Sequence, residues 1–223
     1  MPEGPEVRII RKQLNKLLEG KKVKFVFNTE FYRIPFLEKE VRIIKKVKNK
    51  GKVIYFELDN DKFIINHLGM TGRWLYTKKV NDKHHLRIEF DDGFLLFLDY
   101  RRFGEFKLVN NKELKNILES LGPDVFSKDF NLEFLQYAIR SSKKRIAEFL
   151  VDQKIISGIG NYLRSDILYH ARIYPMRNTS QLTDAEVIRL YHSIIAITKR
   201  SYEEGGASLI TYRNIYGEKG RYE

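Results

Sequence analysis

The sequence contains no cysteine, and this absence excludes more than any other feature of its composition. Without cysteine the chain can form neither a disulfide nor a zinc site that depends on thiolate ligands. Its five histidines are scattered, apart from the adjacent His84 and His85, and do not have the spacing of a metal-ligand set. We therefore expect neither a bound metal nor a cofactor.

The chain also lacks long hydrophobic runs and has fewer acidic than basic residues. No apolar run reaches membrane-spanning length, and no charged start is followed by an apolar signal core, so we expect an intracellular protein that contacts no membrane. The 29 acidic residues face 41 lysines and arginines, which gives a formal net charge of +12. Such a surplus favours a polyanionic partner, most simply nucleic acid, while the alternative is a basic solvated surface.

The first half of the chain is predicted to be one helix followed by strands. Apolar residues recur at helical spacing from Glu3 to about Glu19, where Gly20 ends the pattern. The period then changes to two or to short apolar runs, which is typical of a β-sandwich or barrel. The predicted strands cover residues 22–27, 41–44, 52–58, 62–66, 86–90, 94–98 and 105–109.

The second half is predicted to be a cluster of helices. The helical segments cover residues 112–121, 132–142, 144–153, 161–173 and 183–204. Thr183 and Glu186 have the spacing of a capping box at the start of the last helix. We expect a first domain over residues 1–111, a connecting helix and linker over 112–126, and a second domain over 127–223. No flexible linker separates them, so the halves should pack closely.

Two stretches rich in charge have both a structural and a functional interpretation. The opening MPEGPE places Pro5 in a first helical turn with Glu3 and Glu6 at the positive end of the helix dipole, which is ordinary helix-start chemistry. Two acids beside an N-terminal amine would also suit acid–base catalysis. The lysine-rich KKVKNKGK at 45–52 is either a solvated strand edge or a phosphate-binding surface.

Three further stretches are equally open. In HLGMTGR at 67–73, Met70 is either a packed loop tip or an apolar wedge that enters a DNA base stack. DYRRFGEF at 99–106 places a basic pair beside an aromatic residue and is weak evidence alone. In DQKIISGIGNYLRSD at 152–166, Asn161 either caps a helix after a plain turn or begins a helix whose free amides bind a DNA phosphate.

Taken together, the motifs resemble those of one family. The series P-E-G-P-E, HLGMTGR, D-x-RRFG, LGPD, D-x-K followed by GIGN, and IYGEKG closely resembles the formamidopyrimidine-DNA glycosylase family, the Fpg or MutM and Nei type of base-excision repair enzymes. The resemblance covers essentially the whole chain. It implies an α+β multidomain fold: a helix and a two-layer antiparallel β-sandwich, then a helix-two-turns-helix domain. It also implies a monomer that binds damaged double-stranded DNA between the domains.

The resemblance implies a catalytic role for four residues. After removal of Met1, the secondary amine of Pro2 would attack C1′ of the damaged nucleotide and form a Schiff base. The pKa of an α-amino group is about 8, against about 10.4 for lysine, so part of the Pro2 amine is neutral at physiological pH without burial. Glu3 would handle protons at the sugar ring oxygen and leaving groups, Glu6 would support the amine and sugar, and Lys52 would bind the neighbouring phosphate. The strand would then break by β,δ-elimination.

Seven further residues would contact DNA by the same resemblance. Met70 and Phe103 would fill the space left by the extruded nucleotide, and Arg101 would hydrogen-bond to the estranged base. The residues expected to bind phosphates are His67, Lys154, Asn161 and Tyr216.

The sequence departs from the family in two places near its end. Most members continue the last motif into a four-cysteine zinc finger that contributes an arginine to the phosphates, whereas this chain reads YGEKGRYE at 216–223. We expect the finger either to be missing or to be zincless. Members that prefer 8-oxoguanine have a long lid segment, but only a few residues separate Leu209 from Tyr216 here. We therefore expect ring-opened formamidopyrimidines, hydantoins and oxidised pyrimidines to be preferred over 8-oxoguanine paired with cytosine.

Two other classes of protein compete with the enzyme. A non-catalytic binder of damaged, abasic or kinked DNA would keep the charge, the glycine-rich turn and the wedge residues, but would place no constraint on Pro2, Glu3 and Glu6. An RNA-binding sandwich would be expected to carry an aromatic RNP-type pattern, which is lacking. The joint presence of Pro2, Glu3 and Glu6 favours the enzyme.

Overall fold

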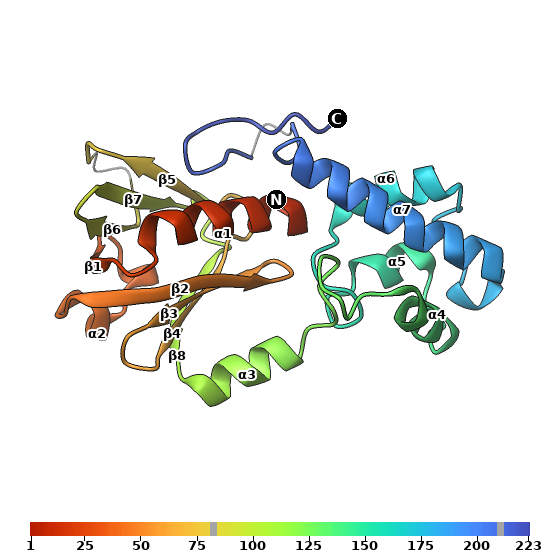
Figure 1. Ribbon diagram of the computed structural model, residues 1–223, viewed down its shortest axis with the longest axis horizontal. Coiled ribbons are helices and arrows are strands. Elements are labelled where there is room, and N and C mark those ends of the chain that lie inside the picture. The colour runs from red at the N-terminus through yellow and green to blue at the C-terminus, as the bar shows by residue number, and fades with distance from the viewer. Residues whose placement is uncertain (81–83, 209–211) are drawn as a thin grey trace.

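The computed structural model describes residues 1–80, 84–208 and 212–223 and has a strand-rich half and a helical half (Figure 1). Helix α1 (Gly4–Leu18) opens the chain. Its first turn contains Pro5, whose missing N–H costs nothing there, and its buried face carries the apolar residues at helical spacing. The first predicted helix is therefore confirmed almost to the residue.

Within the described residues, eight antiparallel strands follow α1, in the spatial order β5-β7-β6-β1-β2-β3-β4-β8. Strands β1 and β2 join at only two residue pairs, so the sheet folds into two layers of four strands. Rings meet across the layers: the Phe56 and Trp74 centroids lie 6.0 Å apart and those of Phe97 and Phe106 6.5 Å. The predicted two-layer sandwich is confirmed. The strands are β1 (Lys22–Phe27), β2 (Arg42–Lys50), β3 (Val53–Leu58), β4 (Phe63–His67), β5 (Arg73–Thr77), β6 (Leu86–Phe90), β7 (Gly93–Leu98) and β8 (Glu105–Val109).

Strand β5 was not predicted from the sequence, nor were the short elements η1 (Glu30–Tyr32) and α2 (Pro35–Glu38). β5 directly follows the glycine-rich turn of HLGMTGR, and only Trp74 within it is fully buried, so its alternation is weak. Its pairing with β7 is long-range and is invisible to local pattern.

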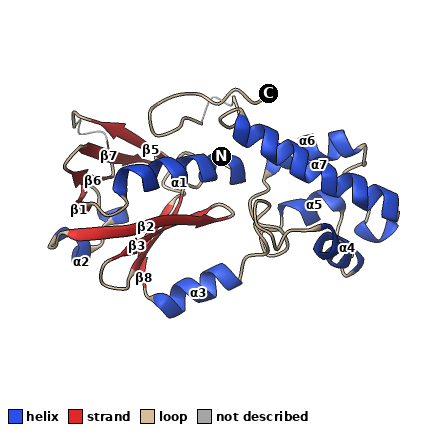
Figure 2. Ribbon diagram, viewed as in Figure 1, coloured by secondary structure: helices blue, strands red, loops and turns tan. Residues whose placement is uncertain are grey.

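The second half is helical, and Figure 2 shows all of its long elements as helices. All five helices predicted there are present, with ends that differ by up to a few residues, and they surround a hydrophobic core of their own. Among the described residues, no helix has the combination of length and apolarity needed to cross a bilayer. The elements are α3 (Asn111–Glu119), α4 (Leu132–Arg140), α5 (Ile146–Val151), α6 (Asn161–Ala171), η2 (Thr179–Gln181) and α7 (Asp184–Glu203).

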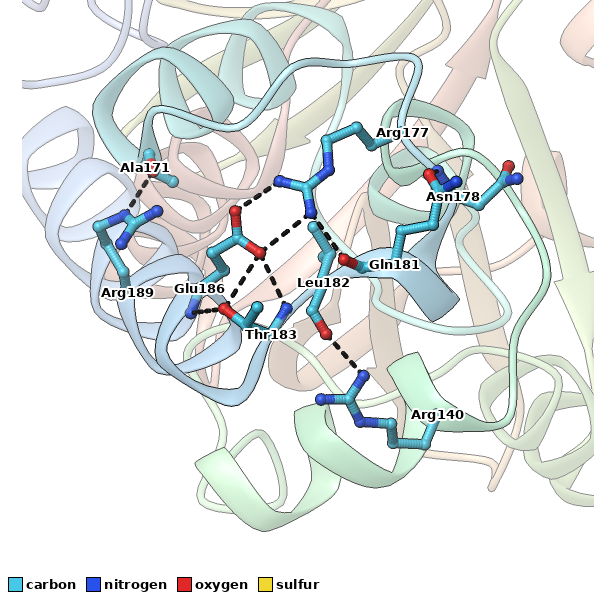
Figure 3. Close-up of polar contacts among 9 residues, drawn as sticks. All are labelled: Arg140, Ala171, Arg177, Asn178, Gln181, Leu182, Thr183, Glu186 and Arg189. Carbon is cyan, nitrogen blue, oxygen red and sulfur yellow. Dashed lines mark hydrogen bonds and ion pairs between the residues drawn. The ribbon is translucent and has the colours of Figure 1, made fainter.

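The start of α7 is fixed by a polar cluster (Figure 3). The Thr183 hydroxyl accepts the Glu186 N–H at 3.3 Å, and the Glu186 carboxylate accepts the Thr183 N–H at 2.8 Å. The Arg177 guanidinium donates to Glu186, and Arg140 donates to the Leu182 carbonyl at 2.7 Å. The predicted capping box is confirmed. Arg140 also connects α4 to the first residue of α7, and Arg177 connects the loop before η2 to Glu186.

The two halves pack directly against each other, as expected. The Gly4 N–H donates to the Gly158 carbonyl at 2.8 Å, and the Gly51 N–H donates to the Asp124 carboxylate at 2.7 Å. The segment after α7 returns to the strand-rich half, where Tyr212 joins the sandwich core. The start of α1, the β2–β3 turn and the loop before α6 therefore meet at one junction (Figure 1).

Candidate functional site

Glu3 lies at this junction and binds the first amides of α6. Its carboxylate accepts the N–H groups of Gly160, Tyr162 and Leu163 at 2.7, 3.1 and 3.3 Å, and the residue is only 3% exposed. The expectation that these amides are free is wrong, because the Glu3 carboxylate accepts them. The alternative interpretation with Asn161 as N-cap is wrong, because Gly160 is the N-cap and Asn161 is the first helical residue.

A glycine is required at position 160 by this contact. A Cβ built on Gly160 would lie 2.3 Å from the Glu3 carboxyl carbon and 2.7 Å from Nζ of Lys52. Gly160 has no side chain with which to cap α6, so Glu3 supplies the acceptor from a distant part of the chain. Gly160 of the GIGN motif therefore both leaves room for the Glu3 carboxylate of the PEGPE motif and donates a hydrogen bond to it.

Burial is the main influence on the ionisation of Glu3. It raises the pKa of Glu3 to about 7, against the opposing effects of the Lys52 cation and of the amide donors, while the Glu6 carboxylate raises the pKa further. A carboxyl group that titrates near neutral pH can give or take a proton under physiological conditions.

Glu6 is also fully buried and is held by both halves. Its Oε2 accepts the Glu3 N–H at 2.8 Å, while its Oε1 accepts the Tyr162 hydroxyl at 2.7 Å and the Ala207 N–H at 2.8 Å. The Tyr162 and Ser201 oxygens lie 3.0 Å apart. Tyr162 and Ser201 were not predicted from the sequence. Tyr162 directly follows the GIGN motif, but no local signal connects Ser201 to Glu6.

Lys52 reaches the same site from the tight turn between β2 and β3. It is 8% exposed, and its burial lowers the pKa of its ammonium group although Glu3 and Glu6 oppose this effect. The neighbouring lysines behave differently, since Lys45 pairs with Asp61 at 3.1 Å and Lys48 with Glu57 at 3.2 Å on the exposed surface. The lysine-rich stretch thus combines a solvated strand with one buried cation.

Pro2 is buried directly before Glu3, and Met1 precedes it with 36% exposure. The structure therefore brings all four predicted catalytic residues to one place: Pro2 and Glu3 are adjacent, the Glu3 backbone donates to Glu6, and Lys52 lies beside Glu3.

The residues expected to contact an opened DNA stack lie on two neighbouring loops. Met70 is 43% exposed and Phe103 is 55% exposed, although both are large apolar side chains. The Arg101 guanidinium carbon lies 4.6 Å from the centre of the Phe103 ring. The two loops thus present an apolar surface with a cation beside it.

His67 lies between the Met70 loop and Lys52. It ends β4 and pairs with Val53, the residue after Lys52, and its Nδ1 accepts the Gly69 N–H at 3.1 Å. Burial and the nearby Lys52 cation lower the pKa of His67, which favours the neutral imidazole.

The remaining predicted phosphate contacts lie on both halves. Lys154 is exposed in the turn before α6, where its N–H donates to Asp152 at 3.0 Å, and Asn161 is exposed at the start of α6. Tyr216 is 44% exposed and lies with its ring centre 6.0 Å from that of Tyr76 in β5. Leu209, at one end of the short segment discussed as a lid, lies outside the described residues.

The site contains the groups needed for proton transfer on a polyanion. Two buried carboxylates and a buried lysine lie beside Pro2, and exposed apolar side chains lie on two further loops. In the described part of the chain, no three histidine, aspartate or glutamate side chains are grouped closely enough to hold a metal ion.

Comparison with known proteins gives a consistent result over the whole chain. Residues 1–106 match the model of the formamidopyrimidine-DNA glycosylase N-terminal domain, and residues 121–213 match that of the formamidopyrimidine-DNA glycosylase H2TH domain. The formamidopyrimidine-DNA glycosylase of Streptococcus pneumoniae is 34% identical over 236 residues, covering 99% of this chain and 84% of the relative. That of Enterococcus faecalis is 35% identical over 240 residues, covering 100% and 84%.

Solved structures show the same similarity. The Lactococcus lactis Fpg in complex with DNA containing an abasic site matches with a TM-score of 0.89 and 30% identity, over 98% of this chain and 84% of that one. The MutM (Fpg) protein of Thermus thermophilus matches with a TM-score of 0.87, 30% identity and the same coverage.

Proposed function

Since the chain belongs to the formamidopyrimidine-DNA glycosylase family, we propose that it is a bifunctional base-excision repair enzyme that removes oxidised bases from double-stranded DNA and then cleaves the abasic strand. The observation that carries this proposal is the pair of buried carboxylates beside Pro2, one with a pKa near 7. A non-catalytic DNA binder has no use for that arrangement.

The proposed reaction begins with removal of Met1, which frees the secondary amine of Pro2. The amine nitrogen attacks C1′ of the damaged nucleotide, and the protonated Glu3 carboxyl donates its proton to the sugar ring oxygen or to the departing base. The base leaves C1′, the amine nitrogen loses its proton, and the bond from C1′ to the protonated ring oxygen breaks as the C=N bond of the Schiff base forms. The imine then withdraws electrons, so that loss of the C2′ proton expels the 3′ phosphate and later loss of the C4′ proton expels the 5′ phosphate.

Glu6 and Lys52 have supporting roles in this proposal. The Glu6 carboxylate already accepts three short hydrogen bonds, which fixes it beside the amine and sugar. Lys52 supplies a positive charge for the phosphate next to the reacting sugar, and approach of that phosphate would return its lowered pKa toward the ordinary range.

The exposed loops are proposed to open the DNA. Met70 and Phe103 fill the stack after the nucleotide leaves, and Arg101 hydrogen-bonds to the estranged base. His67, Lys154, Asn161 and Tyr216 bind phosphates on both sides of the lesion. We place the duplex between a domain of residues 1–111 and a domain of residues 127–223, with residues 112–126 connecting them. A DNA-repair glycosylase works inside the cell, and we propose that this one works at the chromosome.

The lesion preference that we propose rests on the family resemblance, because members that prefer 8-oxoguanine have a long lid and only a few residues separate Leu209 from Tyr216 here. Selectivity for a flipped base depends on contacts in the pocket and on how easily the base leaves the stack. With little chain to cover the base, poorly stacked lesions are favoured: ring-opened formamidopyrimidines, hydantoins and oxidised pyrimidines over 8-oxoguanine paired with cytosine. Residues 209–211 of this segment lie outside the described residues.

The function is tested on a duplex that carries one formamidopyrimidine lesion. The protein should release the modified base and leave a one-nucleotide gap with phosphate on both ends, and Glu3→Gln should slow base release strongly. Glu19→Gln, at an exposed position just beyond the other end of α1, is the control. Tight binding to the lesion duplex without base release or strand cleavage would identify the non-catalytic binder instead.

A further inference from the structure

Asp99, the first residue after β7, is a buried carboxylate that accepts hydrogen bonds from three separate parts of the chain. It is 0% exposed. Its Oδ1 accepts the Thr71 hydroxyl, and its Oδ2 accepts the Tyr32 hydroxyl and the Gly104 N–H, each at 2.7 Å. The three groups that donate these hydrogen bonds are neutral: two hydroxyls and one backbone amide.

Two of the three donors, Thr71 and Gly104, belong to the two loops that carry Met70, Arg101 and Phe103. Thr71 directly follows Met70, and its hydroxyl oxygen also accepts the Arg101 N–H at 3.2 Å. Gly104 directly follows Phe103. The Asp99 carboxylate therefore holds the residue after Met70 and the residue after Phe103, and Thr71 connects it to the Arg101 backbone.

The backbones of the two loops also touch. Gly69 has a φ of +58°, and a Cβ there would lie 2.5 Å from the Phe103 carbonyl carbon and oxygen. Glycine permits both the left-handed conformation and this close approach. The loop of residues 68–72 therefore cannot shift far without displacing the loop of residues 99–104.

Tyr32 anchors Asp99 from the opposite side. Its ring is 2% exposed and packs edge-on against Phe97 of β7, with 5.3 Å between the ring centres. Burial alone would raise the pKa of Asp99, but the hydrogen bonds from Thr71 and Tyr32 lower it below the usual range, so the acceptor is ionised at neutral pH. Hydrogen bonds to an ionised acceptor are stronger than those between neutral groups.

We propose that Asp99 is a positioning residue that holds the Met70 loop and the Arg101–Phe103 loop together as one preassembled wedge for the DNA stack. This role rests on the proposed function, because it concerns how that enzyme reaches its base. A preassembled wedge does not have to be ordered when it meets DNA, so more of the contact energy is available for unstacking. The chemistry of Pro2 and Glu3 does not pass through Asp99.

The test is Asp99→Asn, which keeps the shape but replaces one acceptor oxygen by a donor. Single-turnover base excision from a lesion duplex should fall about tenfold or more, while strand cleavage at a preformed abasic site changes by less than about twofold. A fluorescent base analogue beside the lesion should report slower unstacking by the same factor. Asp91→Asn, at an exposed position in the β6–β7 turn, is the matched control and should change none of these rates.

Two milder variants keep the test informative if Asp99→Asn does not fold. Tyr32→Phe and Thr71→Val each remove one donor, and each should slow excision and unstacking but not cleavage at the abasic site. Equal slowing on both substrates, or no slowing on either, would overturn the positioning role. If the unaltered protein released no base at all, the proposed function would fail, while the unstacking signal of each variant would still test the wedge.

Discussion

Glu3 is next to Pro2 in the sequence, but its hydrogen-bond donors come from residues 157 to 160 positions away. Its carboxylate accepts three amide hydrogen bonds from the start of α6 in the other half of the molecule. Those amides favour the ionised form, and burial favours the neutral form by a larger amount. The balance leaves a carboxyl group that changes charge near pH 7.

The pH dependence of base excision follows from the sign of this shift. Glu3 must be protonated to act as an acid, so its contribution to the single-turnover rate is full below pH 7 and is lost as the pH rises through about 7. Glu3→Gln should lower the rate about 10²-fold and remove this descending limb. A limb that persists unchanged in Glu3→Gln would assign it to another group.

Met70 is a residue whose effect should depend on the substrate. Met70→Ala should slow base removal from duplex DNA far more than strand cleavage at a preformed abasic site, because only the first reaction must open an intact stack. Met176→Ala is a matched control, since Met176 is 48% exposed against 43% for Met70 but lies in the helical half. Equal loss on both substrates would mean that Met70 only packs its loop.

At the scale of elements, local pattern predicted well wherever burial is one-sided. β6 and α1 each bury one face, which gives alternating apolar residues in β6 and helical apolar spacing in α1. Both elements were therefore predicted nearly to the residue. β5 was missed because its neighbours in sequence are turn residues and its partner strand is distant. The Glu3 contact with Gly160 spans 157 positions, so no local signal could reveal it.

The start of α7 offers a prediction about stability. Thr183→Ala removes the side-chain acceptor of the Glu186 N–H and should cost about 1 kcal/mol, whereas Thr183→Ser should retain most of it. Arg177 and Thr183 lower the pKa of Glu186 to about 2, so its contribution is full above the ordinary carboxyl range and is lost as the pH falls toward 2. Urea unfolding at pH 7 and pH 3 should therefore show a smaller difference between Thr183→Ala and the unaltered protein at the lower pH.

At the scale of the whole molecule, the site exists only where the two halves meet. Glu3 and Glu6 lie at the start of α1, but donors to their carboxylates come from the start of α6 and from Ala207 in the segment after α7. The family could be predicted from ordered short motifs, two of which, PEGPE and GIGN, meet at the junction. The roles of Tyr162, Ser201 and Asp99 could not, because they depend on contacts made only in three dimensions.

The net charge of +12 predicts binding that weakens steeply with salt. Lys154→Ala should reduce affinity for lesion and undamaged duplexes alike and should lower the slope of log affinity against log salt by about 1. Lys115→Ala, on the exposed side of α3, is the control and should leave the slope unchanged. A loss confined to the lesion duplex would instead place Lys154 at the damaged nucleotide.

Covalent trapping with borohydride tests the central claim most directly. Protein without Met1, mixed with lesion duplex and borohydride, should form a reduced adduct of protein and DNA, and peptide mass mapping should locate the bond on Pro2. Pro2→Gly should trap much less DNA, because the secondary amine has been replaced. No adduct from the Met1-processed protein, or an undiminished adduct from Pro2→Gly, would contradict the account.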